Sequence, residues 1–315
     1  RTIETPYYYT NRLLQKGLSE YSYSLGFIRN DVGAKSFSYG NPAFLSFHNY
    51  GISDKLKIGY AAEASKDLIN LGPVTSMLIH IAGVLDSAFA VSSYRGKAGV
   101  SGFLGYSFQS RNISANVFLL SNSKAYSNLS SKPTDDKARL QFSSAIGFGG
   151  EKTGFITMEW SSAEMYIEGK MSRTAASYNK ALTKQATFFM TASETKDTET
   201  KDEIFFGVHM YLGKDILGNV SYTRGNGSET KKIGVQKSLP VGSGYGFKAD
   251  VEFADRVYTD NKLQYQNGTG IYELDFSNRI KDNGYSASVS GGVGYIDKSV
   301  FFSRPVNDSF AKVKV

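Results

Sequence analysis

The sequence predicts an all-β chain that folds as part of an antiparallel, up-and-down transmembrane β-barrel. Three observations lead to this prediction. Large apolar residues alternate with small or polar residues in one segment after another, which is typical of strands. The 315 residues include 21 Tyr, 21 Phe and 32 Gly but only 6 Pro, and this composition favours strands and turns. Short turn signals such as GEKTG and QNGTG separate the alternating segments.

The segment EYSYSLGFIR, residues 20–29, is the first clear strand. Its alternate positions point to opposite faces of a sheet. One face is large and apolar and the other is small and polar: Tyr21, Tyr23, Leu25 and Phe27 oppose Ser22, Ser24 and Gly26. The segment therefore predicts a strand with two unlike faces.

The same alternation recurs along the whole chain. Clear examples are KLKIGYAAE (55–63), VSGFLGYSFQ (100–109), QFSSAIGF (141–148), IFFGVHMYL (204–212) and YGFKADVEF (245–253). In total the pattern indicates roughly 17 strands of about 8 to 11 residues each, joined by turns. Two longer polar stretches, SSKPTDDKAR and SETKDTETKDE, are expected to be exposed loops. No boundary between domains is evident, so residues 1–315 are expected to form a single domain of about 17–18 strands, part of a larger barrel.

Two architectures could hold such strands. A soluble β-sandwich or propeller would bury the apolar parity in a core. A membrane barrel would turn the apolar parity toward lipid and line its lumen with the polar parity. Strand length favours the barrel, because a tilted strand needs about 9 to 11 residues to cross a bilayer. The Gly- and Ser-rich opposite face and the aromatic residues near segment ends also favour it.

The polar parity of these segments gives the residues that are expected to line a lumen. They are small, amide-bearing or charged, as a water-filled passage allows. The predicted lumen-facing residues are Ser22, Ser24, Gly26, Lys55, Lys57, Glu63, Gln109, His209, Lys248, Asp250 and Glu252.

Several kinds of chemistry find no support in the sequence. The chain has no Cys and only 3 His, and the histidines lack metal-ligand spacing. Its net charge of +7 is scattered rather than clustered, which argues against nucleic-acid binding. Asp250 and Glu252 could suggest a glycosidase pair, but with Lys248 beside them a charge-balanced wet lumen explains them better. We therefore predict no enzyme activity, no metal and no cofactor.

Three stretches carry a resemblance to a known family. PYYYTNRLLQKGLSEYSYSLGFIRN, from Pro6, resembles the segment that follows the plug domain in outer-membrane ushers of chaperone–usher pili. FSYGNPAFLSFHNYGISDKLKIGYAAEAS is similar to the hairpin that follows. SVFFSRPVNDSFAKVKV is similar to the last strand of the usher barrel and the run beyond it. The residues that carry the resemblance are Pro6, Leu13, Leu14, Gly17, Leu18, Arg304, Pro305, Asn307 and Phe310.

The resemblance implies a multi-pass pore in the bacterial outer membrane. Such a pore secretes pilus subunits that a periplasmic chaperone delivers, and its partners are chaperone–subunit complexes and lipid. It also implies that this chain is the later part of the barrel, without the plug and the N- and C-terminal periplasmic domains. The alternative is an independent outer-membrane porin or receptor barrel that conducts small solutes.

Overall fold

The computed structural model describes residues 13–30, 37–79, 83–213, 215–279, 282–296 and 299–305. Within these ranges the chain consists of strands, turns and bends, without helices. None of these ranges contains a helix with the length and apolarity that crossing a membrane would need. The predicted all-β class is therefore confirmed.

Twenty strands lie in the described ranges, and eighteen of them, β1–β18, belong to one sheet. The last two, β19 and β20, pair only with each other in a separate two-stranded sheet. The strands are β1 (Ser19–Arg29), β2 (Tyr39–Ser53), β3 (Leu56–Ser65), β4 (Leu68–Leu78), β5 (Val84–Tyr94), β6 (Lys97–Gln109), β7 (Ile113–Asn122), β8 (Ala138–Gly150), β9 (Gly154–Met165), β10 (Lys170–Ala181), β11 (Ala186–Lys196), β12 (Thr200–Gly213), β13 (Ile216–Gly225), β14 (Ser228–Lys237), β15 (Gly244–Phe253), β16 (Val257–Gln266), β17 (Ile271–Arg279), β18 (Asp282–Ser290), β19 (Gly292–Ile296) and β20 (Ser299–Ser303).

The strands follow the meander that the sequence predicts. Consecutive strands within β1–β8 pair antiparallel, and so do consecutive strands within β12–β18. Strands of the large sheet are 9 to 15 residues long, and about 9 to 11 tilted residues cross a bilayer. The expected 17 to 18 strands agree with the 18 found in this sheet.

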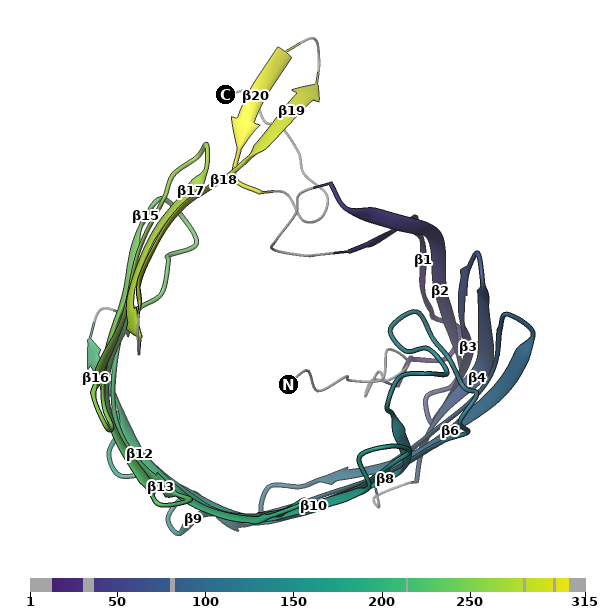
Figure 1. Ribbon diagram of the computed structural model, residues 1–315, viewed down its shortest axis with the longest axis horizontal. Coiled ribbons are helices and arrows are strands. Elements are labelled where there is room, and N and C mark those ends of the chain that lie inside the picture. The colour runs from purple at the N-terminus through teal and green to yellow at the C-terminus, as the bar shows by residue number, and fades with distance from the viewer. Residues whose placement is uncertain are drawn as a thin grey trace. The chain divides into compact units, whose positions relative to one another are not determined.

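The chain divides into two compact units, each of which is described by itself. The first comprises Arg1–Gly150, Ile156–Ala176 and Glu194–Thr200, and the second Glu151–Phe155, Ser177–Ser193 and Lys201–Val315. In Figure 1, β2, β3 and β4 of the first unit lie side by side, as their register requires. The same holds for β15, β16 and β17 in the second unit.

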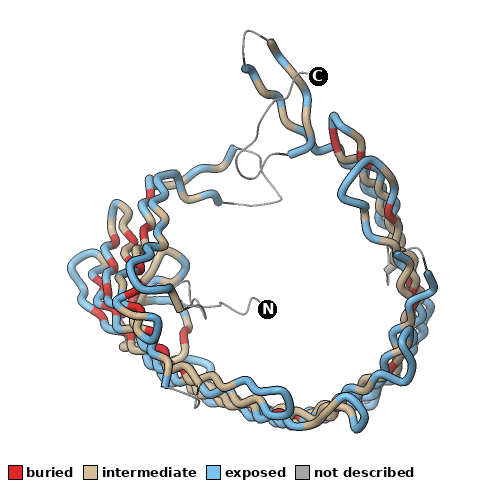
Figure 2. The backbone as a smooth tube through the Cα atoms, turned by 180° about the vertical axis from the view of Figure 1, so that it is seen from behind, coloured by how far each residue is buried: buried red, intermediate tan, exposed pale blue. Residues whose placement is uncertain are grey.

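Register separates the first unit's sheet into two unlike faces. Residues that lie opposite each other in an antiparallel pair share a face. Leu71, Val91 and Val100 lie opposite one another across β4, β5 and β6, and all three are exposed. The neighbouring row holds Asn70 and Ser92, which are 0% and 1% exposed. The large apolar side chains thus lie outside and the polar ones are covered, the reverse of a soluble domain. Many of the buried positions drawn red in Figure 2 belong to β2–β6.

The second unit has the same two-faced construction. Val220, Ile233 and Val251 lie opposite one another across β13, β14 and β15, and Val220 and Ile233 are exposed. The adjacent row holds Asn219, Gly234 and Asp250. We call the sheet face that carries Asn70 the polar face of the first unit. The face that carries Asp250 is the polar face of the second unit.

The entry into β1 depends on two glycines. Gly17 has a φ of 83°, a left-handed conformation that glycine adopts without strain, and its N–H donates to the Gly51 carbonyl oxygen at 2.8 Å. A Cβ on Gly51 would lie 2.2 Å from the Gln15 carbonyl oxygen. The backbone of this turn therefore packs directly on β2, which explains why small residues stand at both positions.

Three expectations about the connecting segments need correction. Only Asp197–Glu199 of SETKDTETKDE lies outside a strand, because β11 runs to Lys196 and β12 starts at Thr200. The stretch SSKPTDDKAR is not simply an exposed loop, since Lys137 is buried. The segment expected to be the barrel's last strand, Ser299–Ser303, pairs with β19 and not with the large sheet.

Candidate functional site: the polar faces

The expected lumen residues of β1, β3 and β6 fall on the polar face of the first unit. Ser24 lies opposite Leu45, which in turn lies opposite Glu63. Glu63 lies opposite Asn70. The rest follow the same register: Ser22, Gly26, Lys57 and Gln109 lie on this face too.

Lys55 is placed differently from the other expected lumen residues. The expectation for it assumes a strand that begins at Lys55, whereas β3 begins at Leu56. Lys55 lies in the turn between β2 and β3, and its N–H donates to Ser53 Oγ at 3.3 Å. It therefore belongs to a strand connection and to neither face.

Part of the polar face is covered by a loop that the sequence analysis did not place there. The connection between β7 and β8, residues 123–137, folds back over β3–β6, and we call it the β7–β8 loop. The N–H of Leu129 donates to Glu63 Oε2 at 3.0 Å. Ser127 donates its N–H to Ser92 Oγ at 2.9 Å, and Asn70 donates to the Tyr126 hydroxyl at 3.2 Å. These contacts bury charged and polar side chains of three adjacent strands.

The loop approaches β6 so closely that only glycine fits beneath it. A Cβ on Gly99 would lie 2.1 Å from the backbone N of Tyr126. Val100, also on β6, pairs with Ser123 of the loop. Ser123 Oγ accepts the Val100 N–H at 2.8 Å, and the Ser123 N–H donates to the Val100 carbonyl. The side chains of Tyr126 and Ser127 are consequently buried, at 5% and 0% exposure. The loop and the wall pack like parts of one core.

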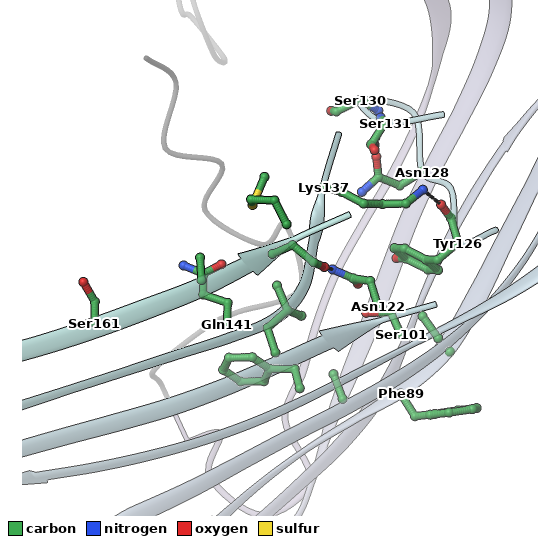
Figure 3. Close-up of a pocket in the computed structure, with 18 of the residues that line it drawn as sticks. Phe89, Ser101, Asn122, Tyr126, Asn128, Ser130, Ser131, Lys137, Gln141 and Ser161 are labelled. Carbon is green, nitrogen blue, oxygen red and sulfur yellow. Dashed lines mark hydrogen bonds between the residues drawn. The ribbon is translucent and has the colours of Figure 1, made fainter. Parts of the chain in front are cut away.

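Lys137 holds the two ends of the loop together. Its ammonium group donates to the carbonyl oxygen of Tyr126, drawn as a dashed line in Figure 3, and to that of Lys132 at 3.1 Å. Burial of the ammonium group lowers the pKa of Lys137. Asn128 Oδ1 accepts the N–H groups of Ser130 and Ser131 at 2.9 and 2.7 Å. The loop is thus a folded element with its own internal hydrogen bonds.

The far end of the loop is tied to the turn between β9 and β10. The Asp136 carboxylate accepts the N–H groups of Ile167 and Glu168 at 3.0 and 3.1 Å. Nearby, the Tyr166 hydroxyl donates to the Asn122 carbonyl at 2.8 Å. The loop is therefore anchored at both ends as well as along its middle.

A cavity of about 940 Å³, lined by both polar and apolar side chains, remains beside the loop. Figure 3 shows that hydroxyl and amide groups dominate its labelled lining, with Asn122, Gln141 and Ser161 from the strands and Asn128 from the loop. Among the described residues, no group of three or more His, Cys, Asp or Glu is arranged to hold a metal ion. The cavity can hold water and hydrogen-bonding groups.

The polar face of the second unit carries a ladder of ion pairs across β14–β16. Asp250 accepts from Lys232 at 2.8 Å and from Lys248 at 3.2 Å. Lys248 also reaches Asp260 at 2.8 Å. Glu252 lies opposite Lys232 and shares this face. The predicted charge-balanced set Lys248, Asp250 and Glu252 is therefore part of a larger network.

The ladder continues across β16–β18. Lys262 reaches Glu273 at 2.7 Å and Asp275 at 3.2 Å. Ser286 donates its hydroxyl to Asp275 at 3.0 Å. Each lysine of the ladder thus meets at least one carboxylate on a neighbouring strand, which leaves a hydrophilic surface whose cations are already paired.

His209 lies on β12 of the same unit. It stands opposite Asn219 on β13 and shares the face of Gly234 and Asp250. Its ring is exposed and stacks on Phe189 with a centroid distance of 4.5 Å. This contact packs side chains of the neighbouring strands β11 and β12 against each other.

The residues that carry the family resemblance are only partly described. Leu13 and Leu14 are half-buried, and the turn at Lys16 and Gly17 leads from them to Leu18. Arg304 donates to the Val241 carbonyl at 2.7 Å, and Pro305 follows it as the last described residue. Pro6, Asn307 and Phe310 lie outside the described residues.

The sequence pattern does not predict the contacts of the β7–β8 loop. Tyr126, Ser127 and Lys137 lie in a polar stretch without strand periodicity, so pattern alone assigns them to solvent. Their partners Asn70 and Ser92 fall on the polar parity, but nothing in that parity says what covers them. The only local signal is a large aromatic residue, Tyr126, inside an otherwise polar connection.

Comparison with known proteins was informative at the level of structure alone. No family model matches the chain, and no curated protein matches it. Among solved structures, it is similar to the E. coli P pilus tip assembly intermediate PapC–PapD–PapK–PapG, with a TM-score of 0.66 over 95% of this chain at 13% identity.

The chain has the fold of an usher translocation pore. Two structures of the P pilus usher (PapC) translocation pore agree, with TM-scores of 0.52 and 0.51 over 87% and 88% of this chain, at 13% and 12% identity. The chain spans 40% of the matched chain in the assembly intermediate and about 60% of the matched pores. The predicted resemblance to the usher barrel is thereby confirmed as a likeness of fold.

Proposed function

We propose that this chain forms part of the outer-membrane pore through which a fimbrial usher secretes and assembles pilus subunits. The likeness of fold to the PapC pore over nearly the whole chain is the observation that carries the proposal. That pore was also determined together with PapD, PapK and PapG in a pilus tip assembly intermediate. By analogy, chaperone–subunit complexes are the partners we propose here.

The two unlike faces of each unit support a position in the membrane. A row such as Leu71, Val91 and Val100 leaves large apolar area uncovered, which water disfavours and lipid does not. The opposite face offers Asn, Ser, Asp and Lys side chains, which suit a water-filled lumen. We therefore propose that the apolar faces contact lipid and that the polar faces line the passage.

The polar faces also suit a passive passage for folded clients. The lysines of the ion-pair ladder, Lys232, Lys248 and Lys262, already pair with carboxylates. A passing subunit therefore meets few unpaired cations there. The serines and glycines of β1 offer it little apolar area to adhere to. A strongly adhesive wall would slow release, because every contact must be broken again.

Deletion of the gene in its own host tests the proposal. Cells that lack the protein should lose the corresponding surface pili, counted by electron microscopy, while chaperone–subunit complexes accumulate in the periplasm. Complementation with the intact gene should restore the pili. Unchanged pili would contradict the usher function.

The same deletion strain separates the usher from a small-solute porin. A porin predicts slower uptake of a small hydrophilic solute and unchanged pilus number. Membrane fractionation provides the accompanying check on location. The protein should sediment with outer membranes and need detergent for extraction, whereas recovery in the soluble fraction would exclude a lipid-facing sheet.

A further inference from the structure

The β7–β8 loop lies on the polar face as a fixed part of the wall. Three strand side chains, Glu63, Asn70 and Ser92, hydrogen-bond to it. Figure 3 shows the Lys137 ammonium group directed at the backbone carbonyl of Tyr126. The similarity of fold to the usher pore assigns no role to this contact. The loop also lies outside the motifs that carry the family resemblance.

The β7–β8 loop packs too closely on β3–β6 for the contact to be incidental. Gly99 permits backbone contact between β6 and Tyr126. Asn70 and Ser127 are each 0% exposed. If the loop left the wall, the Glu63, Asn70 and Ser92 side chains would each lose a hydrogen-bond partner, and charged Glu63 would need rehydration. The wall and the loop therefore form one packed unit.

We infer that the β7–β8 loop is a fixed constriction that sets the size limit of the passage. The inference rests on the proposed function, because only a lumen-lining polar face makes the loop an obstacle. The loop of fifteen residues, 123–137, adds its thickness to the sheet over β3–β6. The cavity beside it marks space that the loop leaves open.

A pair of glycine substitutions on β6 tests the inference. Gly99→Ala places a methyl group against the Tyr126 backbone and should displace the loop from the wall. Gly102→Ala is the matched control, since a Cβ there meets nothing within 4 Å. Each purified full-length protein is reconstituted in liposomes, and swelling is measured with neutral sugars of increasing size. Gly99→Ala should shift the size limit to larger sugars, and Gly102→Ala should not.

Excision of the loop protects the test against a variant that misfolds. Replacement of residues 124–136 by a short Gly-Ser turn removes the obstacle without placing strain on β6. This variant should shift the size limit at least as far as Gly99→Ala. An unchanged limit in both variants, with a wild type that admits sugars, would overturn the inference and leave the pore function standing. A wild type that admits no solute and assembles no pili would instead contradict the proposed function.

A reversible cross-link tests whether the constriction is fixed. The chain contains no Cys, so the double substitution S92C/S127C introduces one defined pair. The Ser127 backbone N lies 2.9 Å from Ser92 Oγ, so the two residues are neighbours, and loss of free thiols on oxidation shows that the disulfide has formed. Oxidation should leave the sugar size limit and pilus number unchanged, because the loop is already seated. Loss of pili on oxidation that reduction restores would show that the loop must move, and would overturn a fixed constriction.

Discussion

At the residue scale, glycine positions show how backbone contact shapes this chain. Gly51 and Gly99 each lie under another segment's backbone, whereas Gly26 and Gly102 face open space. All four occur in similar Gly- and Ser-rich strands, so their sequence contexts hardly differ. The structural role of each glycine therefore follows from what crosses it.

The substitution Gly51→Ala should destabilise the first unit. Its Cβ would meet the carbonyl oxygens of Gln15 and Leu14 at 2.2 and 2.9 Å, and backbone atoms cannot move aside as a flexible side chain can. We expect a loss of about 1 to 3 kcal/mol in the free energy of unfolding, measured by urea denaturation in detergent micelles. Gly26→Ala is the control and should be nearly neutral. Equal effects would contradict the described packing of the Leu14–Gly17 turn.

Asp250 is the best candidate for a structurally important charge. It is the most buried carboxylate of the ion-pair ladder, and it bridges Lys232 and Lys248. Asp250→Ala leaves two ammonium groups near each other without their shared partner. We expect it to cost about 1 to 3 kcal/mol of stability. Asp197→Ala, in an exposed turn, is the control for loss of a carboxylate.

A double-mutant measurement distinguishes the ladder from a general effect of charge. Lys232→Met should partly rescue Asp250→Ala, because it removes one of the two ammonium groups that lose Asp250 as a partner. Denaturation midpoints of the wild type, the two single variants and the double variant give the coupling free energy. Strict additivity would mean that the ion pair contributes nothing to stability.

At the scale of the strand, β14 offers a direct test of the two faces. Ile233 lies on the apolar face and is 55% exposed, while Gln236 lies on the polar face and is also exposed. In water both sites would tolerate a cation, since exposed substitutions usually change stability by less than about 0.5 kcal/mol. In a bilayer they differ, because only the apolar face contacts lipid.

Ile233→Arg should therefore cost about 2 to 4 kcal/mol if the residue lies near the bilayer midplane. Gln236→Arg should cost much less, since its side chain points into the aqueous passage. Reversible unfolding in lipid vesicles measures both. Similar costs for the two variants would refute the assignment of the faces.

At the scale of the whole molecule, the two compact units should respond separately to local damage. Gly51 belongs to the first unit and Asp250 to the second. Amide exchange reports the opening of each region on its own. Gly51→Ala should raise exchange in β1–β3 and leave β14–β17 protected, and Asp250→Ala should do the reverse. A uniform increase in both variants would indicate that the described chain opens as one cooperative unit.

Much of this fold could be predicted because strand periodicity is a local property. The two-residue repeat of β1, with Tyr21 and Tyr23 against Ser22 and Ser24, is written directly in the sequence. The strand boundaries were less accurate. Lys55 falls in a turn, and most of SETKDTETKDE lies in strands, because polar residues extend a strand beyond its apolar part when a neighbouring strand supplies hydrogen bonds.

The all-β class, the meander of paired strands and the composition of the two faces follow from the local sequence pattern. Each of these depends on residues only one or two positions apart. Tertiary structure alone decided that Glu63 meets Leu129, that Gly99 lies under Tyr126, and which carboxylate each lysine of the ladder contacts. These partners are distant in sequence or on separate strands, so strand register and the path of the β7–β8 loop bring them together.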